Sequence, residues 1–467
     1  MKLTIRQIAE ATGGRVVYEM TKKPVTTLDF EVSSVVLDSR QVTEGGVFIA
    51  TVGERVDGHS FVSSVFEKGA VLAVVQREPE ESEEWGPYLL VEDTLQALKN
   101  IGEFYRKSLR IPVIGITGSV GKTSTKEFIA GVLSEKYNVL KTQGNYNNEI
   151  GVPLTLLRIR EEHQAAVIEM GISDFGEMHR LSKMVRPDVA VITNIGQCHL
   201  ENLIDRDGVL RAKTEIFDFM ASEGRICLNG DDDKLRTVVA PEGKELRFFG
   251  LTGQETGTVY ATDVKSKGLW GSDAVMHLVS GASFEAEVPL PGIHMVLNAT
   301  AASCVAEWLG LTTAEIQAGL KKVAAVAGRN HLIRTEKYTL IDDCYNANPV
   351  SMKAGIDLLC MADTDTVAIL GDMFELGTDS DRMHREVGAY GAQKGVGHLI
   401  FVGSNARHMA EAAKEIGGTR VTYIETLEEL KKQLVSEMDS LLPEGGTVLI
   451  KASHGMHFSE VVELLSR

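Results

Sequence analysis

The segment that most constrains the fold joins an apolar run to a helical pattern at Thr117-Gly118-Ser119-Val120-Gly121-Lys122-Thr123-Ser124. The preceding run, IPVIGIT, is typical of a fully buried strand. Residues 122–137 repeat apolar side chains at helical spacing. A glycine-rich turn between a strand and a helix lets backbone amides approach phosphate oxygens, and the helix N-terminus adds partial positive charge. We therefore predict a phosphate-binding loop within an α/β domain.

Two side chains of this loop have chemistry suited to a bound triphosphate. Lys122 can reach the β- and γ-phosphates, and the Thr123 hydroxyl can bind Mg²⁺. The spacing departs from the strict phosphate-loop pattern, because Ile116 stands where its first glycine would be. The loop by itself does not separate GTPases, kinases and ligases. The sequence has no guanine-reading NKxD motif, which disfavours a GTPase.

The alternation of strand and helix patterns along the chain predicts the fold class. From residue 111, apolar strand-like runs alternate with helical ones, as in a parallel sheet covered on both faces. An antiparallel hairpin is expected around 258–290, and four further strands at 338–349, 366–373, 398–404 and 447–453. We predict three α/β domains: a small mixed N-terminal domain (1–92), a central doubly wound, mostly parallel phosphate-loop domain (93–327) and a C-terminal Rossmann-like domain (328–467).

Composition excludes several classes of partner. The 467 residues include 48 Lys and Arg against 65 Asp and Glu, a net charge of −17, which disfavours binding to nucleic acid or an anionic membrane. The five cysteines form no CxxC pair, as expected for reduced thiols without structural zinc. No apolar run is long enough to span a bilayer, and the first residues lack the apolar core of a signal peptide. We expect a cytoplasmic protein, a monomer, whose partners are small molecules.

Three further candidate functional residues, Glu169, His199 and Lys213, lie in the central block. Glu169 ends an apolar strand, and His199 follows the strand that contains VITNIG. Because the carboxyl ends of parallel strands meet at one edge of a sheet, both are expected near the phosphates. A carboxylate there is a hard oxygen ligand for Mg²⁺. Lys213 lies on the next helix, and its residue type and position alone do not distinguish a functional lysine from a solvated one.

Several longer segments resemble the Mur ligase family in order and spacing. They are GITGSVGKTSTKE, KTQGNYNNEIGVP, IEMGIS, TNIGQCHLE and AKTEIF, with DSRQVTEGGVFIATVGERVDGHSF before them and DDCYNANPVSM and LGDMFELG after them. The similarity extends from about residue 32 to about residue 460. The resemblance implies an ATP-dependent ligase of peptidoglycan synthesis. It would add D-alanyl-D-alanine to UDP-N-acetylmuramoyl-tripeptide through an acyl phosphate.

The resemblance also implies roles for individual residues. Thr123 and Glu169 would hold one Mg²⁺, and His199 with a carbamylated Lys213 would hold a second. The implied catalytic residues are Lys122, Glu169, His199, Lys213 and Asp343. The implied ATP-binding residues are Gly118, Ser119, Val120, Gly121, Lys122, Thr123, Ser124, Asn298, Arg329 and Asp343. The implied substrate-binding residues are Ser39, Arg40, Asp57, Gly58, His59, Asn145, Asn147, Asn148, Tyr345, Asn346, Asn348, Lys451 and Ser453.

The same resemblance assigns one ligand to each domain. The first domain would hold the UDP-sugar, the central one ATP, and the third would close over ATP with the dipeptide about a hinge near 326–330. Two alternatives stay open. A folylpolyglutamate synthetase could use the same scaffold, but the Asp-Gly-His segment at 57–59 and YNANP at 345–349 speak against it. A non-catalytic nucleotide switch would have no use for His199 together with Lys213.

Overall fold

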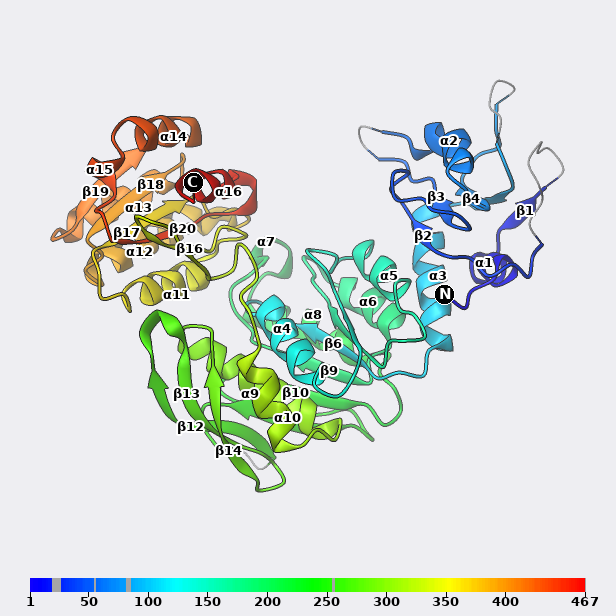
Figure 1. Ribbon diagram of the computed structural model, residues 1–467, viewed down its shortest axis with the longest axis horizontal. Coiled ribbons are helices and arrows are strands. Elements are labelled where there is room, and N and C mark those ends of the chain that lie inside the picture. The colour runs from blue at the N-terminus through cyan, green and yellow to red at the C-terminus, as the bar shows by residue number, and fades with distance from the viewer. Residues whose placement is uncertain (19–26, 54–55, 81–84, 254–256, 467) are drawn as a thin grey trace.

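The computed structural model describes residues 1–18, 27–53, 56–80, 85–253 and 257–466. It contains three sheets, of five, nine and six strands, in chain order. Figure 1 shows the N-terminal sheet and the C-terminal sheet on opposite sides of the central one, well apart from each other. The predicted fold class, three α/β domains, is confirmed. Within these ranges no helix is both long and apolar enough to cross a bilayer.

The N-terminal sheet has the order β1-β5-β4-β3-β2, with β1 antiparallel to β5 and the other pairs parallel. Its elements are α1 (Ile5–Thr12), β1 (Arg15–Val17), β2 (Val35–Val36), β3 (Val47–Ile49), η1 (Gly58–Phe61), α2 (Val62–Glu67), β4 (Leu72–Val75) and β5 (Tyr88–Leu90). Strands β2, β3 and β4 lie within the apolar segments 32–40, 45–53 and 70–76 of the sequence. Strands β1 and β5 are only three residues each, too short to give an alternating pattern.

The central sheet has the order β14-β13-β12-β11-β10-β9-β6-β8-β7. Its strands are β6 (Val113–Thr117), β7 (Val139–Lys141), β8 (Ala165–Glu169), β9 (Val189–Ile192), β10 (Arg225–Asn229), β11 (Glu245–Gly250), β12 (Thr258–Ser266), β13 (Ser272–His277) and β14 (Ser283–Val288). The pairs from β7 to β12 are parallel, and β12, β13 and β14 pair antiparallel. The hairpin expected at 258–290 is therefore a three-stranded extension of the same sheet.

Helices cover both faces of the central sheet. They are α3 (Thr94–Ser108), α4 (Lys122–Leu133), α5 (Gly151–Leu156), α6 (Glu177–Val185), α7 (Leu200–Leu203), α8 (Arg206–Thr214), α9 (Ile293–Trp308) and α10 (Thr313–Lys321), with short turns η2 (Glu215–Phe217), η3 (Leu235–Thr237) and η4 (Gly268–Trp270). Alternate residues of β6 enter different cores: Val113 packs with α3 and α6, and Ile114 packs with α4 and α9. Burial on both faces explains why this strand is continuously apolar.

The N-terminal and central domains share one hydrophobic core. A single cluster of buried side chains includes Ile5 of α1, Val47 of β3, Leu98 of α3 and Val113 of β6. Helix α3 connects the two domains in the chain and lies between them in space (Figure 1). The core therefore continues across the boundary expected near residue 92.

The C-terminal sheet has the order β15-β16-β20-β17-β18-β19, parallel except for β15 against β16. Its elements are β15 (His331–Arg334), β16 (Thr339–Asp342), α11 (Pro349–Leu359), β17 (Thr366–Gly371), η5 (Gly377–Asp379), α12 (Ser380–Gln393), β18 (His398–Val402), α13 (Ala406–Ile416), β19 (Arg420–Ile424), α14 (Leu427–Ser436), α15 (Met438–Leu441), β20 (Thr447–Lys451), η6 (His454–Met456) and α16 (Ser459–Leu465). Two clusters of this domain's own residues fill the sheet's two faces. One of them also takes in Leu269, from the turn between β12 and β13.

Candidate functional site

The turn between β6 and α4 has the backbone of a phosphate loop. Gly118 has φ +149°, and a Cβ on it would lie 1.9 Å from Thr193 Oγ1. Gly121 has φ +82° and precedes Lys122, the first residue of α4. Only glycine fits at either position. A Cβ at position 118 would clash with Thr193, and the left-handed backbone at position 121 disfavours a side chain.

The two residues that follow strand β9, Thr193 and Asn194, hold this loop. Asn194 accepts from the Val120 amide through Oδ1 (2.9 Å) and donates to the Val120 carbonyl through Nδ2 (2.9 Å). Thr193 Oγ1 donates to the same carbonyl at 2.6 Å, and the Ser119 amide donates to the Asn194 carbonyl at 3.0 Å. These bonds fix the loop conformation. Sequence reasoning missed Asn194, although its place directly after a buried strand is a usable signal.

Glu169, at the end of β8, faces the start of α4. Its Oε2 accepts from Thr123 Oγ1 at 2.9 Å and lies 3.6 Å from Lys126 Nζ, and its Oε1 accepts from Asn147 Nδ2 at 2.9 Å. The residue is only 1% exposed. The structure thus brings together the predicted residues Thr123, Glu169 and Asn147. Lys126 was not predicted; its position four residues after Lys122, on the same helix face, is the signal that could have found it.

Burial and charge shift the ionisation of this cluster. Burial alone would raise the pKa of Glu169, but the positive charges of Lys126, Lys122 and Arg329 outweigh it, so the pKa is lowered. Burial lowers the pKa of Lys122, although the charge of Glu169 opposes that shift. Lys122 Nζ donates to the Gly118 carbonyl at 2.8 Å. Glu169 is therefore an ionised carboxylate surrounded by cationic side chains.

Lys213 of α8 is buried near Lys122 and Cys198. It is 1% exposed, and within the described ranges its Nζ has no hydrogen-bond or ion-pair partner. Burial, with the nearby charge of Lys122, lowers the pKa of Lys213 to about 8. In a large fraction of the molecules the Lys213 side chain is therefore a neutral, nucleophilic amine at mildly alkaline pH.

His199 has a left-handed backbone (φ +51°) at the start of α7. Its Nδ1 lies 3.2 Å from Glu375 Oε2, a residue of the C-terminal domain that was not predicted. Burial, and then the charge of Lys213, lower the pKa of His199. Glu375 lies in LGDMFELG, a motif recognised in the sequence, but no pattern indicated its contact across the domains. No group of three or more His, Cys, Asp or Glu side chains that could hold a metal occurs among the residues described.

Several C-terminal residues predicted to bind ligands contact one another. Asp343 follows β16 and accepts from Lys451 Nζ at 2.6 Å, and the same Nζ donates to the Asn346 carbonyl at 2.9 Å. The Arg329 guanidinium lies 4.1 Å from the centre of the Tyr345 ring. These contacts place Arg329, in the 326–330 linker, at one end of the C-terminal sheet with four other predicted residues: Asp343, Tyr345, Asn346 and Lys451.

Asn330 connects this group to the central domain. Its amide donates to Asp343 Oδ1 at 3.2 Å, and its Nδ2 lies 3.3 Å from His294 Nε2 of α9. Its Oδ1 is buried and has no partner in the described part of the protein, and the same holds for Thr117 Oγ1 at the end of β6. Buried polar atoms without partners are rare in native structures, and these two flank the edge where ATP is expected.

Other predicted residues have partners within the protein that account for their positions. Asn298 Oδ1 accepts from Thr125 Oγ1 at 3.0 Å, and Asn148 Oδ1 accepts from the Gly151 amide at 2.8 Å. Asn348 caps α11 by accepting from the Ser351 amide at 2.9 Å. Ser453 Oγ accepts from the Phe374 amide at 2.9 Å. Asn145 is exposed, and its carbonyl accepts from the Asn147 amide.

The predicted UDP-sugar residues form two local arrangements in the N-terminal domain. Asp57 Oδ1 accepts from the His59 amide and lies 2.6 Å from its Nδ1, while His59 Nε2 accepts from the Gln76 amide. A Cβ on Gly58 would lie 2.8 Å from the Thr51 carbonyl oxygen. These contacts give residues 57–59 a structural role.

The second arrangement lies at the surface. Arg40 is exposed and hydrogen-bonds both carboxylate oxygens of Asp38. The Ser39 carbonyl accepts from Lys68 Nζ at 2.9 Å. The Arg40 guanidinium therefore has a carboxylate partner in this structure, and a diphosphate would have to compete with Asp38 for it.

Comparison with known proteins gives consistent results over the whole chain. Three family models match: the Mur ligase family catalytic domain at 31–106, the Mur ligase middle domain at 116–306 and the Mur ligase glutamate ligase domain at 328–454. The UDP-N-acetylmuramoyl-tripeptide–D-alanyl-D-alanine ligase of Bacillus subtilis is 34% identical over 99% of this chain and 98% of its own.

Solved structures agree with the sequence relatives. MurF from Acinetobacter baumannii is 34% identical and superposes with a TM-score of 0.87, covering 100% of this chain and 99% of its own. MurF ligase from Thermotoga maritima, solved in complex with ADP, is 28% identical with a TM-score of 0.79, covering 93% and 97%.

Proposed function

The chain belongs to the Mur ligase family, and from that premise we propose that it joins D-alanyl-D-alanine to UDP-N-acetylmuramoyl-tripeptide in an ATP-dependent reaction. The observation that carries this function is the 34% identity to ligases of that name over nearly the whole of both chains. Such full-length similarity also favours this ligase over a folylpolyglutamate synthetase. A pure nucleotide switch is disfavoured for the same reason.

The central domain supplies the groups that activate the substrate carboxylate. A carboxylate does not react with an amine at neutral pH, so its oxygen first attacks the γ-phosphorus of ATP, giving an acyl phosphate and ADP. The dipeptide amine then attacks the acyl carbon, and phosphate leaves. Phosphoryl transfer depends mainly on alignment and charge stabilisation. Lys122 and the N-terminus of α4 would provide both, and the hydrogen bonds between Asn194 and Val120 hold the loop in place beforehand.

The donor set around Glu169 fits Mg²⁺. A buried carboxylate and a threonine hydroxyl 2.9 Å apart are hard oxygen donors, and the lowered pKa keeps the carboxylate ionised. We assign Thr123 and Glu169 to one Mg²⁺, which would neutralise charge on the phosphates. Lys126 and Asn147 hold the Glu169 carboxylate in position.

His199 and Lys213 suit a second Mg²⁺ only if Lys213 is carbamylated, because an ammonium repels a cation. The neutral amine attacks CO₂ and loses a proton, which leaves an anionic carbamate oxygen donor. Burial without a partner and a pKa of about 8 favour that reaction. Mass spectrometry of the intact protein under native conditions should show one added CO₂, absent from Lys213→Met. An unmodified wild-type mass in bicarbonate buffer would contradict this assignment.

Each domain is proposed to bind one substrate. The N-terminal domain, through Ser39, Arg40 and residues 57–59, would take the UDP-sugar. Arg329 and Asp343 would contact ATP, with Asn298 near its adenine. Tyr345, Asn346, Asn348, Lys451 and Ser453 lie at the end of the C-terminal sheet that would present the dipeptide. All five cysteines are free thiols, as is usual in the reducing cytoplasm, which is the location we propose. We also propose that the protein is a monomer.

The decisive experiment measures phosphate release from ATP with UDP-N-acetylmuramoyl-tripeptide, with and without D-alanyl-D-alanine. Release that requires both substrates, with formation of the pentapeptide, is the expected result. Release with folate and glutamate instead would support the alternative ligase. Nucleotide binding without turnover on either pair would leave the switch as the better description.

A further inference from the structure

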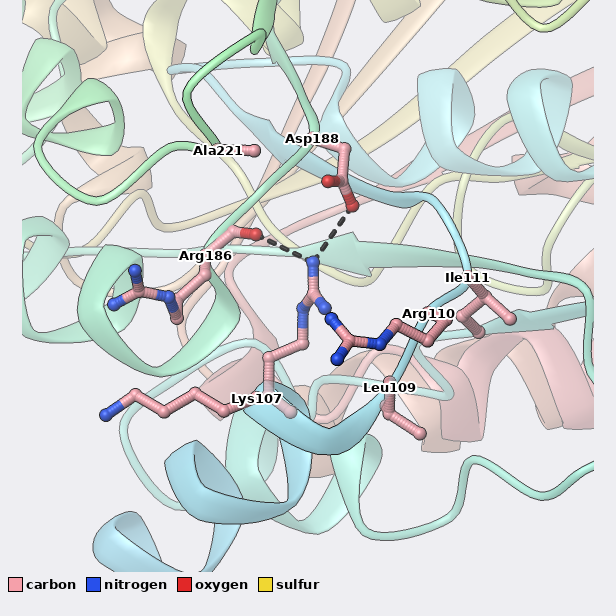
Figure 2. A pocket seen from close by; sticks show the side chains of 8 residues that line it. Lys107, Leu109, Arg110, Ile111, Arg186, Asp188 and Ala221 are labelled. Carbon is pink, nitrogen blue, oxygen red and sulfur yellow. Dashed lines mark hydrogen bonds and ion pairs between the residues drawn. The ribbon is translucent and has the colours of Figure 1, made fainter.

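A pocket in the central domain lies away from the strand ends that carry the phosphate loop. Its volume is about 430 Å³, and its walls come from the end of α3, the connector to β6, the end of α6 and the residue before β9 (Figure 2). It is therefore at the amino ends of β6 and β9. The five residues of β6 place it roughly 15 Å from the loop along the strand.

Arg106 is the buried basic group of this pocket. Its side chain is 8% exposed. Nε donates to the Val185 carbonyl at 2.7 Å, and Nη2 donates to the Arg186 carbonyl at 2.8 Å and to Asp188 Oδ2 at 2.9 Å. Nη1 has no partner among the described residues. The bonded nitrogens fix the guanidinium plane against the end of α6, so Nη1 is held ready to donate.

The pocket also contains positive charge that the protein does not neutralise. Lys107 pairs with Glu103 at 2.6 Å, and Asp188 is shared between Arg106 and the Val113 amide. Arg110 and Arg186 line the pocket, but neither guanidinium has an ion-pair partner within the described ranges. In Figure 2 the Arg110 side chain extends toward the guanidinium that is bonded to Arg186 and Asp188.

A purely structural explanation covers only part of this arrangement. Arg106 binds the last carbonyls of α6, where a cation is favourable. That role requires neither Arg110 nor Arg186. Arg110 and Arg186 line the same pocket as Arg106 and have no ion-pair partner among the described residues, in a chain of net charge −17.

We propose that this pocket binds a small phosphate-bearing anion. Guanidinium groups bind phosphate oxygens through paired hydrogen bonds. A phosphomonoester carries about −1.5 to −2 charge at pH 7, which matches the two unpaired arginines. The apolar side chains of Leu109, Ile111 and Ala221 also line the cavity and can contact an organic portion of the ligand. The volume lies within the roughly 300–1,000 Å³ of small-molecule sites.

Equilibrium dialysis against radiolabelled inorganic phosphate tests the site, with the nucleotide site kept saturated by ADP. Wild-type protein should bind one phosphate per chain saturably. The double variant Arg110→Ala/Arg186→Ala should bind at least about tenfold more weakly, as expected for the loss of charge-assisted hydrogen bonds. The control Lys337→Ala/Lys414→Ala removes two exposed positive charges from the C-terminal domain and should bind like wild type.

A second readout locates the ligand without relying on the nucleotide site. Because Arg106 Nε is fixed to the Val185 carbonyl, its N–H resonance should shift saturably as phosphate is added. Equal losses in both double variants would overturn the proposal, since general charge would then explain binding. It is equally overturned if wild type shows no saturable binding, or if citrate binds as tightly with the same sensitivity to the arginine variants.

Discussion

Lys213 and Lys126 are both buried lysines on central helices, yet their surroundings differ in charge. Lys126 lies 3.5 Å from Glu127 and 3.6 Å from Glu169, whereas Lys213 has no carboxylate partner in the described ranges. Desolvation of an ammonium is unfavourable unless a counter-charge compensates it. Lys213 is therefore retained at the expense of stability, as is common where a residue is needed for chemistry.

We predict that Lys213→Met abolishes ligase activity and raises the free energy of unfolding in CO₂-free buffer. The lowered pKa means that the unfolded chain binds more protons than the folded one between about pH 8 and the ordinary lysine range. Wild-type stability therefore rises with pH through that window, and the gain from Lys213→Met, on the order of 1–3 kcal/mol at pH 7, shrinks there. Denaturant titrations at pH 7 and pH 10 measure it.

Lys126→Met is the matched control for that experiment. It removes a buried lysine that has carboxylate partners, so it should lower stability at pH 7. If both variants change stability in the same direction, the contrast in their electrostatic surroundings is wrong.

At the residue scale, the sequence predicted functional residues that lie at the ends of buried strands. Glu169 was placed beside the phosphate loop, and the structure brings it to Thr123. Two contacts between distant segments were not predicted: that of Asn194 with the phosphate loop, and that of Glu375 with His199. Such contacts depend on which elements the fold brings together, and no local pattern encodes that. His59 was assigned to substrate, but its ring contacts within the protein could not be read from a three-residue motif.

Two elements of the site depend on how a helix begins. Helix α4 starts from a turn with two glycines at positive φ, and α11 starts with the side-chain cap from Asn348 followed by a proline. In the first arrangement the N-cap residue, Gly121, makes no side-chain hydrogen bond to the amides of the first turn. In the second, the Asn348 side chain accepts from the Ser351 amide, and Pro349 has no N–H to satisfy.

Gly118→Ala should abolish ATP binding. The new Cβ would lie 1.9 Å from Thr193 Oγ1, so the loop would have to move away from β9. Gly281→Ala provides a control, because Gly281 also has positive φ (+86°) but nothing within 4 Å of the added Cβ. Calorimetric titration with ATP should show loss of binding only for Gly118→Ala. Unchanged affinity in that variant would contradict the described loop geometry.

Asn348 was predicted to contact substrate, whereas its visible role is that of a helix cap. Asn348→Ala should lower the free energy of unfolding by about 1 kcal/mol, and Asn348→Asp should lose much less, because aspartate caps equally well. Chemical denaturation compares the two variants. The KM for the dipeptide then reports substrate contact separately. A similar loss of stability in both would argue against the cap.

At this scale the parallel strands that are buried on both faces were predicted, since such burial leaves an unbroken apolar run. The parallel strands β11 and β19 were not predicted, because most of their residues are exposed or only partly buried. The three-residue strands β1, β5 and β7 were not predicted, because their pairing depends on neighbouring strands more than on their own pattern.

At the scale of the molecule, the C-terminal domain is attached more loosely than the N-terminal one. Its contacts with the central domain include the 326–330 linker, His199 with Glu375, His294 with Asn330, and the Gly268–Trp270 turn, where Trp270 stacks on Arg334 at 4.0 Å. Gly328 (φ +77°) and Asn330 (φ +49°) give the linker a backbone that can act as a hinge.

We predict that an ATP analogue together with UDP-N-acetylmuramoyl-tripeptide makes the protein more compact. The C-terminal residues Arg329 and Asp343 belong to a domain that Figure 1 shows standing away from the N-terminal sheet, so closure should bring the two nearer. Small-angle scattering should show a smaller radius of gyration with both ligands than with either alone. An identical scattering profile in all conditions would exclude the movement.

The continuous core beneath α1, α3 and β6 has a consequence for how the polypeptide acquires its structure. Residues from the first hundred positions and from the phosphate-loop domain bury one another, so separating the two parts would expose apolar surface on both. The last third of the chain encloses its own interior between two layers of helices and depends little on that assembly. We therefore expect the first two domains to complete their folding together during synthesis, and the third to fold afterwards as an autonomous lobe.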